Sequence, residues 1–445
     1  MRTLLVANRG EIAARIIGTA RRLGIETVAV YSEADADLPF VHDADIAVPI
    51  GAAAPASSYL NVEAVLAAAR DTGATAIHPG YGFLSENADF AETVAAEGMV
   101  WVGPSPAAMR AMSDKVDARN TMAAAGVPVA PGSPDPVHSA EVAMAEADRI
   151  GYPVMVKASA GGGGIGMAVA HDRAEVADAF ATARSRAERF FASPAVLIEK
   201  FLPRARHVEV QILGLPDGSV VALGERDCSV QRRHQKVLEE TPSPGVSPAL
   251  RQRLLEIAVA AGESVGYRNA GTVEMLLDVD TSEVWFLEMN TRLQVEHPIT
   301  EMVTGLDLVE EQLRIADGQM PTFGAVAPTP RGHAIELRIY AEDPVRFLPG
   351  PGLISQWQLP NGEHIRVDAG YRNGVKVTPF YDPLMAKLVV WGETREEMLQ
   401  RARTAVESCH ITGPKCNLPF FAEVLNDPTF IGGQYTTNLI AQMRA

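Results

Sequence analysis

The sequence is poor in cysteine, poor in positive charge and free of long apolar runs. It contains 3 cysteines in 445 residues, which excludes a disulfide-stabilised scaffold. Its 39 lysines and arginines against 55 acidic residues give a net charge of −16. That charge argues against general binding to nucleic acid or to an acidic membrane surface. Charged residues interrupt each apolar stretch well before the ~18 residues of a membrane span. We therefore expect no nucleic-acid partner, no membrane segment and a cytoplasmic location.

The rest of the composition is that of an ordinary globular protein. Hydrophobic residues make up 47% of the chain and charged residues 21%, which excludes general disorder. At roughly 100–200 residues per domain, the length suggests two to four domains. Cys228, Cys409 and Cys416 have no metal-ligand spacing, so we expect reduced thiols without a metal or redox role.

The first part of the chain alternates strand and helix signals. The apolar run Thr3–Ala7 is followed by a helical pattern over Glu11–Leu23 and a second apolar run at Thr27–Tyr31. The alternation continues to about residue 112 and predicts a parallel sheet covered by helices on both faces. Arg9-Gly10-Glu11 follows the first strand in place of G-x-G-x-x-G. We therefore expect a structural layer there and no dinucleotide site.

Beyond residue 112 the pattern changes twice. The proline-rich segment Pro128–Pro136 predicts a linker, and residues of about 131–204 are expected to form a separate mobile subdomain within a second domain, 113–330. Short strands, among them Ile354–Leu359, and a helix over Arg395–Glu407 then predict a mixed α+β domain over 331–445. The chain is thus expected to be an α/β protein in three parts.

A glycine run, Gly161–Gly166, comes directly after a predicted strand, Tyr152–Ala158. Backbone N–H groups without side chains can surround a phosphate, and a flexible loop suits a lid over a nucleotide. Taken alone, the run is equally consistent with a flexible turn that binds nothing. Lys157 near the end of the strand favours the nucleotide, because it adds an ammonium within reach of the same phosphates.

Two further strands, Thr272–Val279 and Glu283–Glu288, are joined by a turn centred on residue 281. In an antiparallel pair, Glu274 and Glu288 then lie nearly opposite each other, and Asn290 points to the same side as Glu288. Two carboxylates and an amide oxygen on one spot are suitable ligands for Mg²⁺. The alternative is a solvated acidic strand face, which the apolar neighbours of these residues disfavour.

The segment after this hairpin is rich in polar side chains. Arg292, Gln294 and Glu296 alternate, so in an extended chain they share one face and could hold and deprotonate a small oxyanion. We expect His297-Pro298 to end the segment. A loop of satisfied polar residues is an equally good interpretation of the segment alone. The dense stretch Glu225–Lys236 is consistent with an anion site or with a surface salt-bridge network.

Together these segments resemble the ATP-grasp superfamily and, within it, the biotin carboxylase family, over essentially the whole chain. The motifs that carry the resemblance occur in family order. They are Ala7–Ala13, His78–Asn87, Lys157–Ser159 with the glycine run, Glu225–Lys236, Glu288–Pro298 and Ala341–Pro344. The resemblance implies a three-part ATP-grasp architecture: an N-terminal α/β domain, an ATP-grasp domain with a mobile glycine-rich lid, and a C-terminal biotin carboxylase domain.

The resemblance also implies an activity. Members of this family phosphorylate bicarbonate with MgATP to carboxyphosphate and then carboxylate N1 of biotin held on a carrier, as the first half-reaction of an enzyme such as acetyl-CoA carboxylase in fatty acid biosynthesis. Mn²⁺ can stand in for Mg²⁺. The expected partners are a biotin carboxyl carrier protein or domain and a carboxyltransferase subunit. The final acceptor, whether acetyl-CoA, propionyl-CoA, pyruvate or another compound, stays open.

Site residues are carried over by position. Those implied for ATP are Lys115, Lys157, Gly163, Gly164, Glu199, Lys200, Leu202, His207, Gln231, His234 and Leu276. Those implied for the metal are Glu274, Glu288 and Asn290. Those implied for bicarbonate are Lys236, Arg292, Gln294 and Val295, with Glu296 as the base that deprotonates it. Arg338 would stabilise the biotin enolate, and Tyr81 and Gly82 would line the biotin site.

The sequence departs from the family at a few positions. Ile165 and Ala168 stand where members usually carry basic lid residues, so the lid has less positive charge, and Gly18 replaces an arginine that supports a homodimer in some members. Two rivals remain: another ATP-grasp ligase, such as an aminoimidazole ribonucleotide carboxylase-type or carbamoyl phosphate-forming enzyme, and a catalytically silent nucleotide-binding protein. Arg292, Gln294–Glu296 and Arg338 argue against the first, and intact metal and base residues argue against the second.

Overall fold

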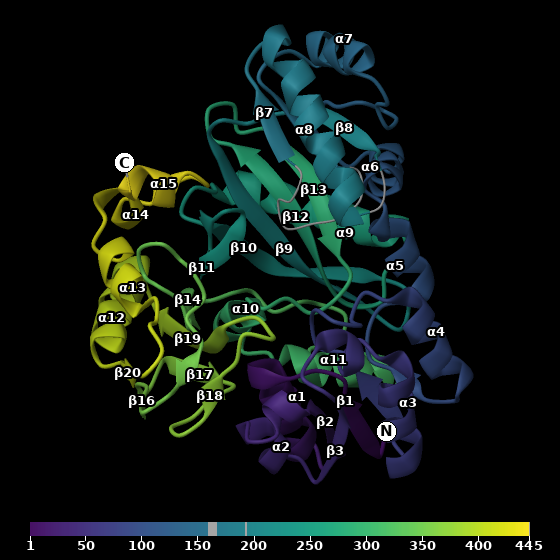
Figure 1. Cartoon of the computed structure of the whole chain (residues 1–445), viewed down its shortest axis with the longest axis vertical. Helices are drawn as coiled ribbons and strands as arrows, with labels where there is room; N and C mark the ends of the chain where they lie inside the picture. The colour runs from purple at the N-terminus through teal and green to yellow at the C-terminus, as the bar shows by residue number, and fades with distance from the viewer. Residues whose placement is uncertain (159–166, 192–193, 445) are drawn as a thin grey trace.

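The computed structural model of the chain describes residues 1–158, 167–191 and 194–444. Its N-terminal part, at the bottom of Figure 1, is built on a parallel five-stranded sheet in the order β3-β2-β1-β4-β5. The strands are β1 (Thr3–Val6), β2 (Glu26–Ser32), β3 (Ile46–Gly51), β4 (Ala76–His78) and β5 (Val100–Trp101). The flanking helices are α1 (Gly10–Arg22), α2 (Pro39–Asp43), α3 (Val62–Thr72) and α4 (Ala88–Ala96), with short 3-10 turns at Glu33–Asp35 and Pro55–Ser57.

The parallel sheet predicted from the alternating pattern is confirmed, and both of its faces are covered. Alternate residues along β1 and Ala7, which follows it, enter different apolar clusters: Leu4 and Val6 pack into one, and Leu5 and Ala7 into another. This is the burial expected of a parallel strand between two helix layers. The predicted strands are present, but β3 gave no strand signal, because it contains a proline and only one fully buried side chain.

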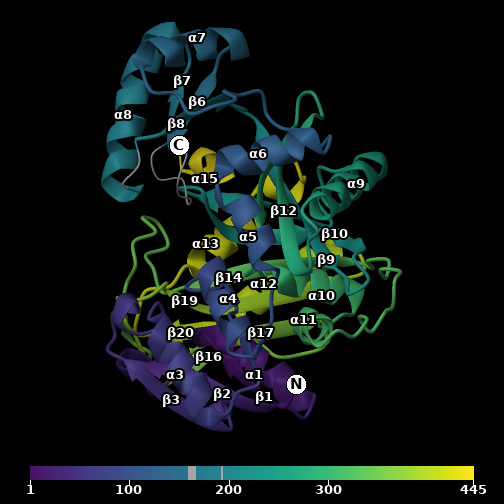
Figure 2. The same ribbon diagram turned by 90° about the vertical axis from the view of Figure 1, so that its right-hand side faces the viewer.

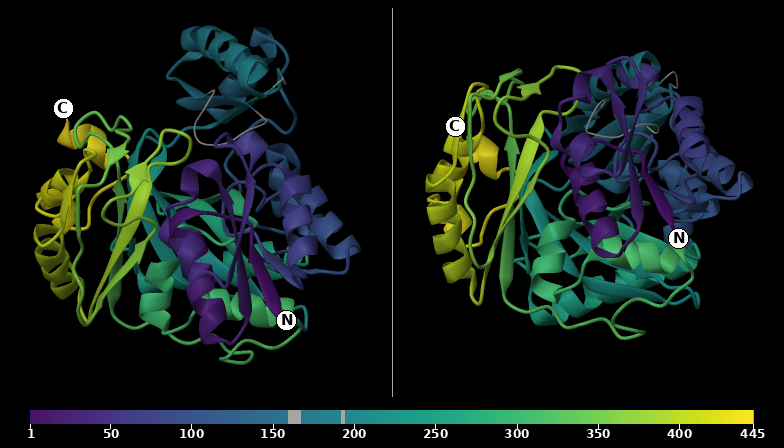
Figure 3. Two further views of the ribbon diagram at one scale, coloured as in Figure 1. Left: turned by 60° about the horizontal axis from the view of Figure 1, so that its bottom comes forward. Right: turned by 90° about the horizontal axis from the view of Figure 1, so that it is seen from below.

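A small antiparallel sheet, β7-β6-β8, stands apart from the rest of the molecule (Figure 3, left). It comprises β6 (Val154–Ala158), β7 (Met167–Ala170) and β8 (Val196–Lys200), covered by α7 (Ala140–Ile150) and α8 (Arg173–Phe191). Its own apolar cluster includes Val156, Phe180 and Ile198. The glycine run falls outside the described residues, and the mobility of this subdomain remains a prediction. Helices α5 (Pro106–Ser113) and α6 (Lys115–Ala124) connect it to the N-terminal part.

The centre of the molecule is an antiparallel sheet in the order β13-β12-β9-β10-β11-β14-β19-β17. Its strands are β9 (Ala205–Gly214), β10 (Val220–Arg232), β11 (Gln235–Thr241), β12 (Asn269–Asp278), β13 (Val284–Asn290), β14 (His333–Tyr340), β17 (Ile365–Ala369) and β19 (Leu384–Gly392). Associated helices are α9 (Pro248–Ser264), α10 (His297–Thr304) and α11 (Leu308–Ala316). Because β11 pairs with β14, hydrogen bonding continues across residue 330, where the sequence predicts a domain boundary.

The C-terminal part adds two short strand pairs and four helices, at the left of Figure 1. They are β15 (Gly352–Leu353) with β18 (Lys376–Val377), β16 (Gln356–Gln358) with β20 (His410–Thr412), α12 (Arg395–Glu407), α13 (Leu418–Val424), α14 (Pro428–Ile431) and α15 (Leu439–Met443). The helix predicted at Arg395–Glu407 is confirmed. The strand predicted over Ile354–Leu359 is present but shorter, as β16 over Gln356–Gln358, because the chain switches from one partner strand to another just before it. Within the described residues, no helix is both long and apolar enough to cross a membrane.

Candidate active site

A cavity of about 1610 Å³ is lined by residues of all three parts of the molecule. Figure 2 shows how the small sheet β7-β6-β8 lies above the large central sheet. Nearly all of the site residues predicted from the sequence line it. They are Tyr81, Gly82, Lys115, Lys157, Glu199, Lys200, Leu202, His207, Gln231, His234, Lys236, Glu274, Leu276, Glu288, Asn290, Arg292, Gln294, Val295 and Arg338. Glu296 lies behind this lining and is bonded to it through Lys236 and Arg338. Gly163 and Gly164 fall outside the described residues.

The residues predicted to hold a metal meet on the β12–β13 hairpin. Glu274 is the register partner of Glu288, as the position of the turn predicts. The Asn290 side chain donates a hydrogen bond to Glu274 Oε1 at 2.8 Å. Burial and the neighbouring Glu274 raise the pKa of Glu288, because two adjacent carboxylates repel each other. A cation between them would relieve that repulsion, and their oxygen atoms suit Mg²⁺, so these residues fit the metal predicted from the sequence.

Lys236 on β11 connects the hairpin to the segment that follows it. Its Nζ lies 2.5 Å from Glu209, 2.7 Å from Glu274 and 2.7 Å from Glu296. Burial lowers the pKa of Lys236, but these three carboxylates outweigh burial and hold the pKa well above its usual range. The ammonium therefore stays charged, in a position where it can also meet a small anion.

His207 on β9 is the second positive partner of Glu274. Its Nε2 lies 2.8 Å from Glu274 Oε2, and its Nδ1 lies 2.8 Å from the Gln231 side-chain nitrogen. Burial lowers the pKa of His207, but the carboxylates of Glu274 and Glu209 together outweigh burial, so the pKa is raised above its usual value. Burial would also raise the pKa of Glu274, yet Lys236 and His207 together hold it well below its usual value. Glu274 is therefore ionised and available as an oxygen ligand.

The segment Thr291–Glu296 differs from its predicted extended form. Strand β13 ends at Asn290, and the chain then turns into α10, which begins at His297. The segment ends at His297-Pro298, as predicted, because these residues begin the helix α10 and proline is tolerated in the first helical turn. The predicted side chains still converge: Arg292 donates to Asn290 Oδ1 at 2.8 Å and to Gln294 Oε1 at 2.9 Å.

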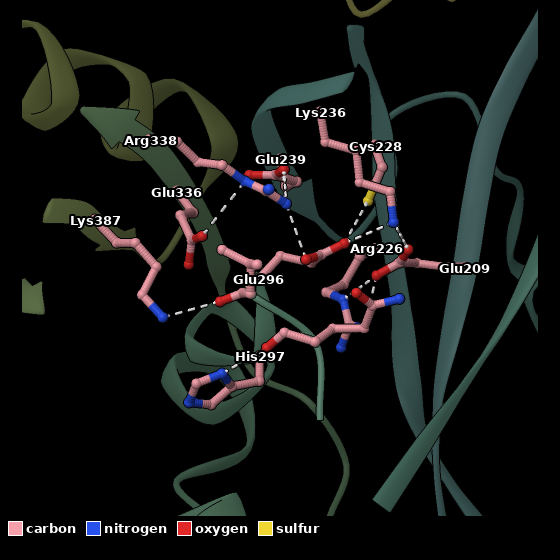
Figure 4. Close-up of polar contacts among 12 residues, drawn as sticks. Glu209, Arg226, Cys228, Lys236, Glu239, Glu296, His297, Glu336, Arg338 and Lys387 are labelled. Carbon is pink, nitrogen blue, oxygen red and sulfur yellow. Dashed lines mark hydrogen bonds and ion pairs between the residues drawn. The ribbon is translucent and has the colours of Figure 1, made fainter. Parts of the chain in front are cut away.

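Arg338 on β14 and Glu296 face each other at the centre of Figure 4. One terminal nitrogen of Arg338 lies 2.9 Å from Glu296 Oε2 and 2.6 Å from Glu239 Oε1. Burial raises the pKa of Glu296, but Lys236, Arg338 and Arg226 outweigh burial and hold the pKa well below its usual range. Glu296 is thus a carboxylate here, and its proton affinity increases when a bound anion draws those cations away.

The opposite end of the cavity carries two lysines close together. Lys157 on β6 lies 2.5 Å from Glu199 on β8. Lys115 is the first residue of α6, and Asp114 caps that helix by accepting from the N–H groups of Val116 at 2.8 Å and Asp117 at 3.0 Å. Burial and the nearby Lys157 lower the pKa of Lys115. Two adjacent ammonium groups favour a polyanion such as the phosphates of ATP.

Not every predicted nucleotide residue directs its side chain into the cavity. Lys200 donates from Nζ to the backbone carbonyls of Gly151 at 3.0 Å and Tyr152 at 2.7 Å. Its ammonium therefore joins β8 to the residues that precede β6, and only the rest of Lys200 faces the cavity. His234 sits in a left-handed turn with φ of 65°, and burial lowers its pKa.

Tyr81 and Gly82 belong to a loop fixed by the first motif of the chain. The Asn8 side chain donates to the carbonyls of Pro79 at 2.6 Å and Tyr81 at 2.8 Å. Gly82 has φ of +70°, in the left-handed region that favours glycine. The predicted biotin residues are therefore placed by the N-terminal sheet, and they line the same cavity as Arg338.

Several site residues carried no role in the sequence-based interpretation. Glu209 and Arg226 form a fully buried ion pair beneath Lys236, and Glu239 bonds Arg338. The thiol of Cys228 lies 3.8 Å from Glu296 Oε1, although its spacing along the chain indicated no site. Simple alternation would have placed Lys236 and Glu239 on opposite faces of β11, but a register shift between β10 and β11 lies between them. The pairing of β10 with β9 likewise leaves no local signal in the sequence.

Comparison with known proteins agrees with this geometry. Three family descriptions match the chain in order: "Biotin carboxylase, N-terminal domain" over residues 1–109, "Carbamoyl-phosphate synthase L chain, ATP binding domain" over 114–321, and "Biotin carboxylase C-terminal domain" over 336–442. A biotin carboxylase of Halalkalibacterium halodurans is 51% identical, covering 98% of this chain and 96% of the relative. Biotin carboxylase 2 of Bacillus subtilis is 49% identical, covering 99% of each chain.

Solved structures are similarly close. A Campylobacter jejuni biotin carboxylase, described as a β,γ-ATP complex, superposes with a TM-score of 0.95 at 42% identity, covering 99% of this chain and 98% of that one. The biotin carboxylase domain of Hydrogenobacter thermophilus 2-oxoglutarate carboxylase, described as a dimer with MgADP, ADP and bicarbonate, gives a TM-score of 0.95 at 41% identity, covering 99% and 97%.

The fold and the cavity define an ATP-dependent ligase of the ATP-grasp class. More specifically, the chain belongs to the biotin carboxylase family. The family and the three-part architecture inferred from the sequence motifs are therefore confirmed, and the rival ATP-grasp ligases are set aside.

Proposed function

We propose that the enzyme runs both steps of biotin carboxylation in the large cavity, with MgATP and bicarbonate meeting at the β12–β13 hairpin and biotin entering beside Arg338. The observation that carries this proposal is the bonding of one ammonium, Lys236, to both the hairpin residue Glu274 and the candidate base Glu296. The two reaction centres thus share a buried charge.

In the first step, the lysine pair Lys115 and Lys157 holds the phosphates, and Glu274, Glu288 and Asn290 hold Mg²⁺. The metal, when bound, neutralises phosphate charge and orients the γ-phosphate. Leu202 and Leu276 offer apolar walls for the adenine ring of ATP. The nucleotide site is completed by Glu199, Lys200, His207, Gln231 and His234. The lid subdomain, whose sequence includes Gly163 and Gly164, is proposed to close over ATP and exclude water.

Bicarbonate is proposed to bind among Lys236, Arg292, Gln294 and Val295. The anion takes over part of the hydrogen bonding that Lys236 now gives to Glu296, which raises the proton affinity of Glu296. Glu296 then accepts the bicarbonate proton, a bicarbonate oxygen forms a bond to the γ-phosphorus, and ADP leaves. The product is carboxyphosphate, which must be kept from water.

In the second step, carboxyphosphate breaks down to CO₂ and phosphate, and the phosphate removes the proton from biotin N1. Negative charge then develops on the ureido oxygen of biotin. Arg338 is positioned to stabilise that charge, with Tyr81 and Gly82 lining the biotin site. N1 attacks CO₂ and forms carboxybiotin.

The partners follow from the reaction. Biotin must arrive on a carrier protein or domain, and a carboxyltransferase must pass the carboxyl group to its acceptor. Relatives at 46–47% identity are named as chains of a pyruvate carboxylase and of a methylcrotonoyl-CoA carboxylase. The acceptor therefore varies within the family, and acetyl-CoA is one candidate. A homodimer is also proposed. Gly18 on α1 replaces the arginine that supports the dimer in some members, and a Cβ added at Gly18 would have no atom of the chain within 4 Å.

The proposed function is tested by ATP hydrolysis with bicarbonate and free biotin each present or omitted. We expect ADP release to depend on bicarbonate and to rise when free biotin is added. A rate of ADP release that depends on neither bicarbonate nor biotin would contradict the proposal. ADP release with bicarbonate but no formation of carboxybiotin would limit the proposal to its first step.

A further inference from the structure

Lys387 is a buried lysine with no assigned role. It lies in the string Met385-Ala386-Lys387, which is only a poor match to the sequence around a biotinylated lysine. The side chain is 0% exposed, so it is inaccessible for modification. On strand β19, Lys387 is the register partner of Arg338 on one side and of Asp368 on the other, so all three side chains point to the same face of the sheet.

The Lys387 ammonium reaches the segment predicted to bind bicarbonate. Its Nζ donates to the backbone carbonyl of Val295 at 3.0 Å, and the side chain points toward the backbone next to Glu296 (Figure 4). That carbonyl belongs to the peptide plane that also holds the N–H of Glu296. Fixing its direction therefore fixes the direction in which Glu296 leaves the backbone.

Two further carboxylates near Lys387 keep its ammonium in place. Glu11 Oε2 lies 3.1 Å away at the start of α1, and Asp368 Oδ2 lies 3.8 Å away. The ammonium also stands 6.0 Å from the ring centre of Tyr81, on the predicted biotin loop. Lys387 thus lies close to the N-terminal helix, the bicarbonate segment and the biotin loop at once.

The adjacent carbonyl of the segment is also bonded by a buried side chain. His297 Nδ1 lies 2.8 Å from the Gln294 carbonyl. Burial and the positive charge of Lys387 hold the pKa of His297 well below its usual range, so the neutral ring donates from Nδ1. Two consecutive carbonyls of the segment are therefore bonded by buried side chains, which fixes the path of the backbone before Glu296.

We propose that Lys387 is a positioning residue for bicarbonate: by bonding the Val295 carbonyl, it sets the place of Val295 and Glu296 relative to Arg338. This inference rests on the proposed function, because it assumes that bicarbonate binds at Val295 and reacts at Glu296. It assigns Lys387 no contact with ATP, whose phosphate-binding lysines lie on α6 and β6. Loss of Lys387 should therefore affect the two substrates unequally.

The test compares Michaelis constants for bicarbonate and ATP in Lys387→Met. We expect the bicarbonate constant to rise on the order of tenfold, the effect of losing one charge-assisted hydrogen bond, while the ATP constant stays unchanged. Lys376→Met is a matched control, because Lys376 is an exposed lysine of the same C-terminal part. Its bicarbonate constant should equal that of the wild type.

A double variant separates positioning from charge balance. Lys387→Met alone leaves Glu11 buried without its cation, which destabilises the protein, whereas Lys387→Met with Glu11→Gln removes both charges. We expect the double variant to recover the melting temperature but to keep the raised bicarbonate constant. Recovery of both, or an unchanged bicarbonate constant in both variants, would overturn the inference alone. A wild type without bicarbonate-dependent ADP release would instead overturn the proposed function.

Discussion

Buried charges at the site are held by neighbours that they share. Lys236 is bonded to Glu209, Glu274 and Glu296, and Arg338 to Glu239 and Glu296. Each cation therefore has more carboxylates than it can neutralise, and an arriving anion competes with them for the same hydrogen-bond donors. Substituting one of these residues changes the proton affinity of the others, so each test below uses a readout specific to one step.

The metal assignment is tested by Glu288→Gln, which removes a charge and keeps the size of the side chain. We expect Mg²⁺ affinity to fall and turnover to drop by about a hundredfold or more, because a neutral amide is a poor ligand for a hard cation. The measurement is ADP release as a function of Mg²⁺. Glu283→Gln is the control, because Glu283 is exposed at the turn of the same hairpin. Near wild-type activity of Glu288→Gln at limiting Mg²⁺ would refute the assignment.

The division of labour between Glu296 and Arg338 is tested by their alanine variants. Glu296→Ala should depress both bicarbonate-dependent ADP release and biotin carboxylation, because the base acts before phosphoryl transfer. Arg338→Ala should depress carboxylation by about a hundred- to a thousandfold and leave some ADP release, because its partner charge develops on biotin. The ratio of ADP to carboxybiotin is measured for both. Equal loss of both activities in both variants would show that the roles are not separate.

A pH-dependent effect on stability is expected from Glu239. Burial raises its pKa from 4.5 to about 7, against the opposing effect of Arg338. Between about pH 4.5 and about pH 7 the unfolded chain has lost this proton and the folded chain retains it, so folding becomes less favourable as the pH rises. Glu239→Gln removes the carboxyl group that binds this proton, so the variant does not show this pH dependence. Its melting temperature relative to wild type should therefore be higher at pH 8 than at pH 5. A difference independent of pH would contradict the shift.

At the scale of the element, the hairpin and helix caps place the reactive side chains. The turn of the β12–β13 hairpin sets Glu274 against Glu288, and this could be predicted because an antiparallel register follows from the turn position. The turn into α10 at His297 was not predicted, because the alternating polar side chains before it also fit an extended chain. The contact of Cys228 with Glu296 joins residues 68 positions apart, so no local pattern reports it.

The helix cap at Lys115 gives a prediction at this scale. Asp114→Ala removes the N-cap of α6 and should cost about 1 kcal/mol of stability. Because Lys115 is the next residue, we also expect the Michaelis constant for ATP to rise. Ser105→Ala removes the corresponding cap of α5, where Ser105 accepts from the Ala108 N–H at 3.2 Å and no predicted site residue follows. This control should lose similar stability and leave the ATP constant unchanged. An ATP Michaelis constant that is unchanged in both variants would show that the cap of α6 does not contribute to nucleotide binding.

At the scale of the whole molecule, one sheet unites the parts that the sequence divides. The strand pair β11–β14 places Lys236 and Arg338 on neighbouring strands of a continuous sheet. Arg9, which is held by Asp35 of its own part at 2.7 Å, attaches the N-terminal part by donating to Tyr371 of the C-terminal part at 3.1 Å. Three regions far apart in the sequence are thus held around one cavity. The sequence predicted the parts, but the pairing between them depends on contacts that only the folded chain brings together.

The central claim is that a bicarbonate oxygen attacks the γ-phosphorus of ATP in this cavity. The most direct measurement is the fate of oxygen in ¹⁸O-labelled bicarbonate, followed into phosphate before the label exchanges with water. If carboxyphosphate forms and then breaks down to CO₂, each phosphate released during biotin carboxylation should carry one labelled oxygen. Phosphate that carries no label, its one new oxygen coming from the solvent, would show that water attacks ATP directly and would contradict the account.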